Sequence, residues 1–440
     1  MSNVIVAHAK KKVKLKRTRA PDFFFDFWHP FFYPALMTTQ PQKPQRILSI
    51  DAFRGLVMLL MIGSGLQLYN VAKKFPESPI WQTIGFHTNH VPWSGGSLHD
   101  MIQPGFSFLV GVALPFSIAS RRAKGQGFGR MLFHASWRAL LLIALGIFLR
   151  SNGKPFTNFS FEDTLSQIGL GYVLLFLLGF VRPALWHWVA FGVIVVGYWG
   201  FFALHPSPGE DFNYPAVGVP ADWSHHYDGF MAHWNKNSNA AWAFDQWFLN
   251  LFGREKLWEF NGGGYATLSF IPTLGTMLLG LIAGTWMKEA TARGPLLLRL
   301  FLAGVILTAA GLGAEAVGIC PIVKPIWTPA WTLYSGGICF LFLLGFTLLF
   351  DNGSPVRFLA FPLVVLGANS IFLYCLNGLT GGWIRETLKT HLALAERHWE
   401  FKTYEMFGPE YETAVRGGLV ILIFWLVLLW MYLKRIFVKI

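Results

Sequence analysis

The fold is decided by residues 330–350, which read Ala330-Trp-Thr-Leu-Tyr-Ser-Gly-Gly-Ile-Cys-Phe-Leu-Phe-Leu-Leu-Gly-Phe-Thr-Leu-Leu-Phe350. This stretch contains no Asp, Glu, Lys or Arg. It also lacks the alternation of apolar and polar residues that marks a strand of a membrane β-barrel. A helix needs about 20 apolar residues to cross the hydrocarbon core of a bilayer. The stretch therefore predicts a membrane-spanning helix.

Nine further apolar runs have a similar length and the same continuous character. The sequence thus predicts an all-α, polytopic integral membrane protein with about ten transmembrane helices. The predicted helices are 54–72, 101–120, 131–150, 164–181, 184–204, 264–287, 295–317, 330–350, 358–378 and 414–434.

The composition agrees with a membrane protein. Of 440 residues, 53% are hydrophobic and 13% are charged, whereas soluble domains carry about 25% charged residues. This excludes an ordinary cytosolic globule and a disordered chain. The net charge of +13 does not indicate a nucleic-acid partner, because the basic residues cluster at the ends of apolar runs, where they set orientation and contact anionic lipid. Cys320, Cys339 and Cys375 form neither a disulfide framework nor a metal-binding spacing.

Lys and Arg in the short connections predict the orientation of the helices. Basic residues precede the first helix and follow the second, the sixth and the last. Both termini and alternate connections are therefore expected in the cytoplasm. Four long connections then face outward and could build a site, namely residues 73–100, 151–163, 205–263 and 379–413.

The chain divides into an N-terminal tail, residues 1–45, and one multi-helix domain, residues 46–440, with residues 205–263 as an outer insertion. The tail is basic and aromatic, but Pro30 and two aspartates interrupt it, so it is neither a signal peptide nor a span. Met37 looks like a natural start. Residues 1–36 are therefore interpreted as a mis-called extension or a disordered tail, with an interfacial lipid anchor as the rival reading.

Polar chemistry concentrates before the second helix, where the chain reads His87-Thr-Asn-His90-Val-Pro-Trp93-Ser-Gly-Gly-Ser-Leu-His99-Asp100. A histidine beside a carboxylate can be held in one tautomer and act as nucleophile or general base. We therefore take His90 and Asp100 as candidate catalytic residues. The simpler alternative for Asp100 is a helix N-cap. Zinc is disfavoured, because the spacing of the histidines matches no familiar site.

Several segments together resemble the transmembrane heparan-α-glucosaminide N-acetyltransferase family. The segments run in order from about residue 46 to the end of the chain. They are Arg46-Ile-Leu-Ser-Ile-Asp-Ala-Phe-Arg54-Gly55, His90-x-x-Trp93-x-Gly95 with Asp100 and Pro104, Trp137-Arg138, Lys324-x-x-Trp327, Asn369-Ser370, and the C-terminal Lys434-Arg-Ile-Phe-Val-Lys-Ile440.

The resemblance implies an acetyl-CoA-dependent N-acetyltransferase that carries acetyl from cytosolic acetyl-CoA to a glucosamine amine across the membrane. It implies a catalytic role for His90 with Asp100 as partner. Acetyl-CoA is then a co-substrate, and no cofactor or metal is bound permanently. CoA phosphates need cations near the inner face, so Arg54 and Arg138 are the expected CoA-binding residues, unless they only set topology. The expected acceptor or pocket residues are Trp93, Lys324, Trp327, Asn369 and Ser370.

The sequence departs from the family pattern at four places that bear on the acceptor and CoA contacts. These are Gly65, Ser166-Gln167, the run Asn261-Gly-Gly-Gly264, and Asn377. The outer insertion also carries His225-His-Tyr227 and His233-Trp-Asn-Lys-Asn237. These residues suit a sugar-binding surface or, equally, a polar lid fastened over the helices.

The sequence therefore predicts an acyltransferase in a bacterial inner membrane, acting on an amino sugar or surface glycan. Its expected partners are acetyl-CoA, this acceptor and the lipid bilayer, and a homo-oligomer is compatible with the sequence. A solute transporter would have a similar hydropathy, but the chain shows no internal repeat. A non-catalytic scaffold would not need His90 and Asp100 at this spacing. Acetyl-CoA turnover would separate the three.

Overall fold

Apolar runs in this chain become helices because a backbone in lipid must satisfy its own hydrogen bonds. The computed structural model describes residues 47–351, 354–399 and 402–438, so the interpretations of the N-terminal tail fall outside the described residues. Residues 46–440 form one compact unit. In its described residues the regular structure is helical, with one isolated β-bridge between Ser94 and Val323.

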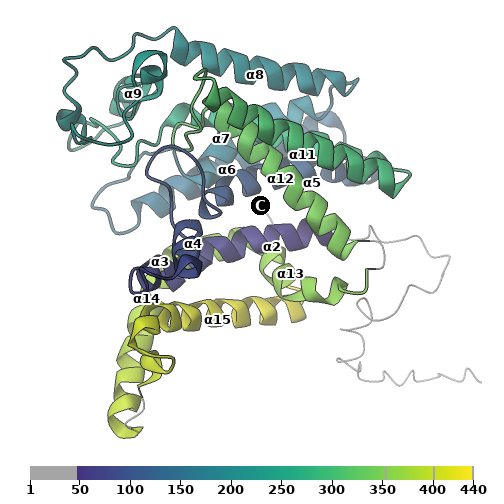
Figure 1. Ribbon diagram of the computed structural model, residues 1–440. Helices are drawn as coiled ribbons and strands as arrows, with labels where there is room; N and C mark the ends of the chain where they lie inside the picture. The colour runs from purple at the N-terminus through teal and green to yellow at the C-terminus, as the bar shows by residue number, and fades with distance from the viewer. Residues whose placement is uncertain (1–46, 352–353, 400–401, 439–440) are drawn as a thin grey trace, which may run out of the picture. The chain divides into compact units, whose positions relative to one another are not determined.

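Fourteen α-helices are described, and several of them lie side by side in Figure 1. They are α2 Leu48–Gly63, α3 Leu68–Ala72, α4 Pro79–His87, α5 Ile102–Ala123, α6 Phe128–Ser151, α7 Thr164–Leu178, α8 Leu185–Ala203, α9 Ala240–Phe248, α10 Phe270–Glu289, α11 Arg293–Ala316, α12 Pro329–Phe350, α13 Phe361–Ala368, α14 Ser370–Trp399 and α15 Glu412–Leu433.

Eight described helices are long and apolar enough to cross a membrane, or nine if the bent pair α13 and α14 counts as one span. This confirms the all-α, polytopic prediction. Every predicted run contains a helix, but three differ from a single span. The first run, 54–72, breaks after Gly63 into the 3₁₀ turn Ser64–Leu66 and the short α3, with Gln67 at φ 50° between them. α7 has only 15 residues. The ninth run breaks at Asn369, where the two helices meet at an angle of 64°. The first helix also begins at Leu48, earlier than expected, because the Asp351 carboxylate accepts hydrogen bonds from the Ser49 N–H and hydroxyl.

Glycines allow the closest helix contacts. A Cβ on Gly280 would lie 1.9 Å from the Phe108 carbonyl oxygen, and one on Gly111 would lie 1.8 Å from that of Met277. α5 and α10 therefore touch through their backbones, as small-residue motifs allow in membranes. A Cβ on Gly55 would meet the Leu363 carbonyl oxygen at 1.9 Å, which accounts for this glycine at the contact between α2 and α13.

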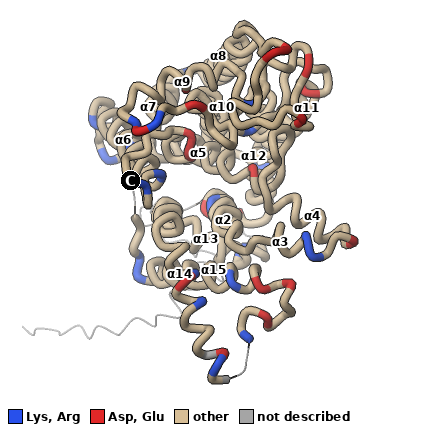
Figure 2. The backbone as a smooth tube through the Cα atoms, turned by 90° about the vertical axis from the view of Figure 1, so that its left-hand side faces the viewer, with Lys and Arg blue, Asp and Glu red and all other residues tan. Residues whose placement is uncertain are grey.

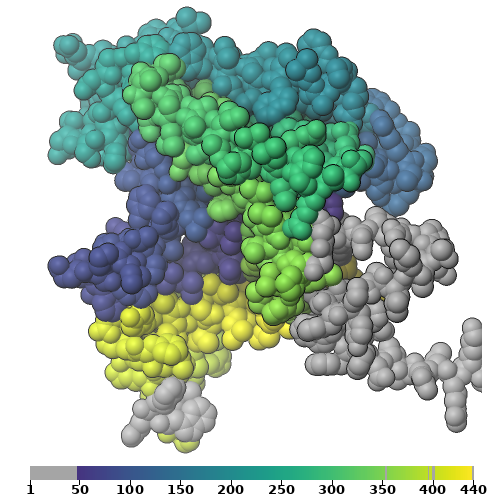
Figure 3. Space-filling view, turned by 45° about the vertical axis from the view of Figure 1, so that its right-hand side comes forward, coloured from purple at the N-terminus to yellow at the C-terminus, as the bar shows by residue number. Residues whose placement is uncertain are grey.

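The described helices have two sets of ends. The end of α2 and the starts of α5 and α7 contribute to a cavity beside His90, whereas the ends of α5, α7 and α10 surround another cavity. We name these sides the His90 face and the opposite face. Figure 2 looks onto the side that carries α4 and α9, where charged residues of both signs are scattered over the loops. In Figure 3, α2 lies in a recess between α12 and α15.

Candidate functional site

The segment before α5 is held in an irregular path by backbone contacts with a distant loop. The Gly95 N–H donates to the Ile322 carbonyl oxygen at 2.8 Å, beside the bridge between Ser94 and Val323. Gly95 has φ +89°, a left-handed value that favours glycine. The Glu315 carboxylate accepts from the Ser94 hydroxyl and the Ile322 N–H. These contacts fix the loop that carries His90 against the loop that carries Lys324.

Asp100 is the centre of the site. Its side chain is 1% exposed, and its Oδ1 lies 2.6 Å from His90 Nδ1. Its Oδ2 accepts from the Ser97 N–H and hydroxyl and from the Val91 N–H. The N-cap of α5 is Met101, without a side-chain cap bond. The N-cap alternative for Asp100 is therefore wrong: the carboxylate turns back onto the preceding loop.

Lys324 completes a buried ion pair that joins distant parts of the chain. Its Nζ lies 3.0 Å from Asp100 Oδ1 and 3.2 Å from His90 Nδ1, and its side chain is 6% exposed. The ammonium can only donate. Asp100 is thus the acceptor for both neighbours, which places a proton on His90 Nδ1 and leaves Nε2 with a free lone pair. This tautomer follows from the hydrogen-bond pattern.

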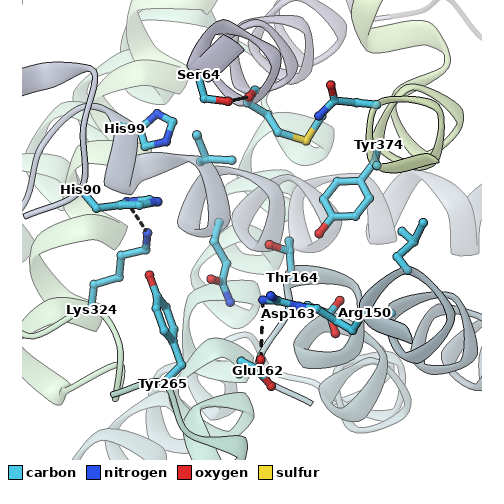
Figure 4. Close-up of a pocket in the computed structure, with 17 residues that line it drawn as sticks. Ser64, His90, His99, Arg150, Glu162, Asp163, Thr164, Tyr265, Lys324 and Tyr374 are labelled. Carbon is cyan, nitrogen blue, oxygen red and sulfur yellow. Dashed lines mark hydrogen bonds and ion pairs between the residues drawn. The ribbon is translucent and has the colours of Figure 1, made fainter. Parts of the chain in front are cut away.

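His90, His99 and Lys324 line one cavity of about 370 Å³ (Figure 4). The His90 and His99 rings lie 4.5 Å apart, centroid to centroid. The cavity is lined further by residues from α6, α14 and the loops before α7 and α10. Among these are Arg150, Glu162, Asp163, Tyr265, Tyr374 and Asn377.

The far wall of the cavity is charged. Arg150 lies 3.7 Å from the Glu162 carboxylate. Asp163 Oδ1 caps α7 by accepting from the Leu165 and Ser166 N–H groups. One cation thus faces two carboxylates, so this wall is not a simple basic site for phosphates. No motif or spacing in the sequence predicts that these residues lie near His90.

Tyr265 is a site residue that the sequence reasoning missed. In Figure 4 its hydroxyl points toward Lys324, and both residues line the cavity. It follows the glycine run at residues 262–264, whose last member has φ +74° and lies so close to Trp93 that a Cβ would be 2.5 Å from the indole. The glycine at position 264 is therefore explained by its contact with Trp93 and did not indicate that Tyr265 would be a site residue.

The structure places the two predicted pocket tryptophans in the protein interior. Trp93 is fully buried and packs edge-on against Trp223. Trp327 is 1% exposed, and its indole N–H donates to the Thr276 hydroxyl. Trp93 follows His90, and Trp327 follows Lys324, by three residues. Neither side chain is among those that line the cavity.

Asn369 and Ser370 lie at the break between α13 and α14, away from the cavity lining. The Asn369 side-chain amide donates to the Ile436 carbonyl oxygen, and its carbonyl oxygen accepts from the Val438 N–H. Asn369 therefore fastens the segment after α15, and Ser370 begins α14. The structure does not bring either residue to His90.

Arg54 and Arg138 also lie outside the lining of the cavity beside His90 and of the one on the opposite face. Arg54 pairs with Asp51 at 3.2 Å in the first turns of α2. Arg138, in the middle of α6, donates to the Tyr172 hydroxyl and stacks over the same ring. Each arginine thus has a partner within the helix bundle.

The amides of the outer insertion are turned inward. Asn235, Asn237 and Asn239 are each at most 3% exposed. They bond to backbone groups of the same insertion, including the Tyr227, Val217 and Ala241 backbones. Gln167, at one of the family departures, likewise bonds the Phe161 and Thr267 carbonyl oxygens. These amides are therefore turned into the protein and stabilise its own loops, and whether the insertion serves as a sugar-binding surface or as a lid over the helices stays a prediction.

Within the described ranges, no group of three His, Cys, Asp or Glu side chains is placed to hold a metal ion. His87 Nδ1 accepts from the Leu98 N–H, and His90 is engaged by Asp100. The chemistry that the side chains themselves offer is proton transfer or nucleophilic attack at His90 Nε2, with Asp100 as the orienting group.

The chain is similar to two known enzymes. Human heparan-alpha-glucosaminide N-acetyltransferase is 24% identical over 373 residues, which cover 75% of this chain and 52% of the human protein. The mouse enzyme of the same name is 24% identical over 147 residues, or 32% of this chain and 20% of the mouse protein. No family model matches the chain.

The chain spans about half the length of the human relative, and less of the mouse one. The longer match includes three quarters of this chain and so most of its membrane helices. The chain is therefore a distant relative of heparan-alpha-glucosaminide N-acetyltransferase, as the resemblance of its motifs indicated.

Proposed function

We propose that this chain is a membrane acetyltransferase that moves an acetyl group from acetyl-CoA to the amine of an amino sugar or related glycan. One observation carries the proposal: His90, a buried aspartate 2.6 Å from its Nδ1 and a buried lysine meet in one cavity. Ionisable side chains that contact one another in a cavity are frequent at functional sites. The distant enzyme relatives support the same reaction class.

In the proposed reaction the acceptor amine attacks the thioester carbonyl carbon while His90 Nε2 takes the amine proton. The carbon–sulfur bond then breaks, and the thiolate of CoA receives the proton from the imidazolium. Asp100 stabilises the imidazolium through Nδ1. Lys324 lines the cavity with donors to spare, so it can stabilise the carbonyl oxygen as negative charge develops there. Tyr265 is placed to donate to the same oxygen.

A second route uses His90 as nucleophile. Nε2 would take the acetyl group first, CoA would leave, and the amine would then attack the acetyl-imidazole. The direct route asks for less change in the site, and we adopt it. The two routes differ in one observable: only the second releases CoA in a single turnover without an acceptor.

The test is release of CoA thiol from acetyl-CoA by purified protein in detergent, with and without glucosamine. We expect acceptor-dependent release by the wild type and none by His90→Ala. His391 provides the matched control, because it is exposed on α14 outside the cavity lining, so His391→Ala should retain turnover. An active His90→Ala protein would refute the catalytic role, and a wild type without turnover would favour a transporter or scaffold.

We retain Arg54 and Arg138 as proposed contacts of the CoA phosphates. Loss of one charge-assisted contact costs on the order of 1.5–3 kcal/mol, so Arg138→Gln should raise the KM for acetyl-CoA about 10- to 100-fold. If Arg138 only supports Tyr172, the melting temperature falls and KM stays unchanged. We further propose a bacterial inner membrane, with the His90 face outside and both termini in the cytoplasm.

A further inference from the structure

A second cavity, of about 280 Å³, lies at the opposite face between the ends of α5, α7 and α10. Three cations line it, Arg122, Arg182 and Lys288, and no carboxylate is among its lining residues. All three side chains are exposed. The remaining lining is small or apolar, with Gly179 and Ile118 at the contact of α7 with α5.

The cavity exists because α7 is short. Its 15 residues span about 22 Å, against about 30 Å for the hydrocarbon core of a bilayer. Its first residue, Thr164, lines the cavity beside His90, so the missing length falls at the opposite face. Residue Gly179 ends the helix, and the neighbouring α5 and α10 continue past it. Arg182 occupies the connection that follows.

The positive charge of the three side chains is larger than the partial negative charge of the helix C-termini around the cavity. Three helix C-termini meet here, and each contributes about half a negative charge. Against three positive side chains this leaves about half of the positive charge uncompensated. Glu289 follows Lys288 but lies outside the lining. Arg122 stacks over the Phe180 ring, which fixes its guanidinium at the cavity. The site is therefore suited to an anion.

This cavity is separate from the site of His90. Between the two, α5 and α10 touch through Gly111, Gly280 and Gly284, where a Cβ on any of the three would lie within 2.3 Å of a backbone oxygen. The nearby surface is apolar and exposed: Leu174 and Leu177 lie on the last two turns of α7, and Trp186 lies at the start of α8. An anionic group that is attached to apolar chains fits these surroundings better than a soluble anion does.

We propose that this cavity binds the phosphate of an anionic phospholipid from the leaflet at the opposite face, with the acyl chains along the exposed surface of α7. Basic cavities between membrane helices recognise such head groups. The inference is independent of the acetyltransferase proposal, because it uses none of the residues near His90.

The experiment is a thermal unfolding titration in nanodiscs of phosphatidylcholine with increasing phosphatidylglycerol. Arg122→Gln with Lys288→Gln is compared with Lys124→Gln and Arg130→Gln, two cations near the same helix ends but outside the lining. Phosphatidylglycerol should raise the melting temperature of the wild type and of the control pair. The cavity pair, Arg122→Gln with Lys288→Gln, should need about 25-fold more phosphatidylglycerol for the same rise in melting temperature. The reason is that about 1 kcal/mol per cation corresponds to about fivefold in affinity.

Separate arms add inorganic phosphate or CoA to discs of phosphatidylcholine alone. Inorganic phosphate should not change the melting temperature. CoA, which the proposed acetyltransferase binds elsewhere, should raise it equally in the wild type and in the cavity pair. If the cavity pair and the control pair lose the stabilisation by phosphatidylglycerol equally, the proposal is overturned, because general attraction of anionic lipid to the basic surface would then explain the effect. Stabilisation by CoA that depends on Arg122 and Lys288 would overturn it in favour of a soluble phosphate ligand. If the cavity pair does not fold, Arg182→Gln replaces it, because Arg182 lies outside the helices. This variant should need about fivefold more phosphatidylglycerol than the wild type.

Discussion

At the scale of single residues, Asp100 and His90 should behave as one unit. Asp100→Asn keeps an acceptor for the Ser97 N–H but removes the charge that stabilises an imidazolium. The activation free energy of transfer should therefore rise by several kcal/mol, and turnover should fall accordingly. His90→Ala should abolish transfer. The double variant should then be little worse than His90→Ala alone, since the two residues act together. Additive losses in this cycle would contradict the coupling.

Lys324 allows a separate prediction on stability. Removing one partner of a buried ion pair costs about 3–5 kcal/mol, because the other charge is left without compensation. Lys324→Met should therefore lower the melting temperature strongly, since it strands Asp100. Adding Asp100→Asn to Lys324→Met should restore part of the stability while turnover remains low. The measurement is thermal unfolding beside thiol release, and a double variant less stable than Lys324→Met would argue against the pair.

The sequence predicted His90 and Asp100 because only ten residues separate them. Lys324 was expected near the acceptor from the resemblance, but its contact with Asp100 spans 224 residues and follows from no local pattern. Trp93 and Trp327 show the opposite case. The resemblance implied a pocket role for both, whereas in the structure their large rings fill the protein interior.

At the scale of elements, α9 is attached to the start of α10 by Asp245, whose Oδ2 accepts from the Thr267 N–H at 2.8 Å. Burial raises the pKa of Asp245 to about 7, and the Glu162 charge adds to the rise. The folded protein thus holds a proton that the unfolded chain releases above about pH 4. The free energy of unfolding therefore decreases as the pH rises from about 4 to about 7, because over this range the carboxyl ionises in the unfolded chain but stays protonated in the folded protein.

Asp245→Asn removes this titration and retains an acceptor for the Thr267 N–H. Between about pH 4 and about pH 7 the wild type should lose stability relative to Asp245→Asn, by on the order of a few kcal/mol in the free energy of unfolding, and its melting temperature should fall accordingly. Parallel curves for the two proteins over this range would show that the carboxyl does not titrate there.

The contact between α5 and α10 supplies another prediction. Gly280→Ala places a methyl group against the Phe108 carbonyl oxygen, so the helices must separate, at a cost of about 1–3 kcal/mol. Gly313→Ala is the control, because nothing lies within 4 Å of its Cβ and alanine favours the helix. Thermal unfolding should show a lower midpoint for Gly280→Ala only, and equal midpoints would mean that the contact is not tight.

The periodicity of the apolar runs predicted the helices well, because spans are set by bilayer thickness. It could not reveal the break at Asn369, whose side chain bonds Ile436 and Val438, some 70 residues away. Nor could it show that α7 ends early, since residues 179–181 are apolar as well. Both features depend on contacts made after the helices associate.

At the scale of the whole chain, the orientation of the helices decides which side of the membrane His90 faces. Asp222→Cys, in the outer insertion, should react with an impermeant maleimide in intact cells. Lys124→Cys, at the opposite face, should react only after permeabilisation. Cys375→Ser provides the background, because Cys320 and Cys339 are buried. The reverse labelling pattern would place His90 in the cytoplasm and contradict the proposed orientation.

The pairing of Asp100 with Lys324 also sets an order of events during synthesis. At about 5–20 residues per second, the 224 residues that separate the two take roughly 11–45 s to add. During that interval the carboxylate at the start of α5 has no ammonium partner. The reactive centre therefore cannot be complete before about three quarters of the 440 residues have been made, and a nascent chain arrested before residue 324 carries His90 without the charge that completes its surroundings.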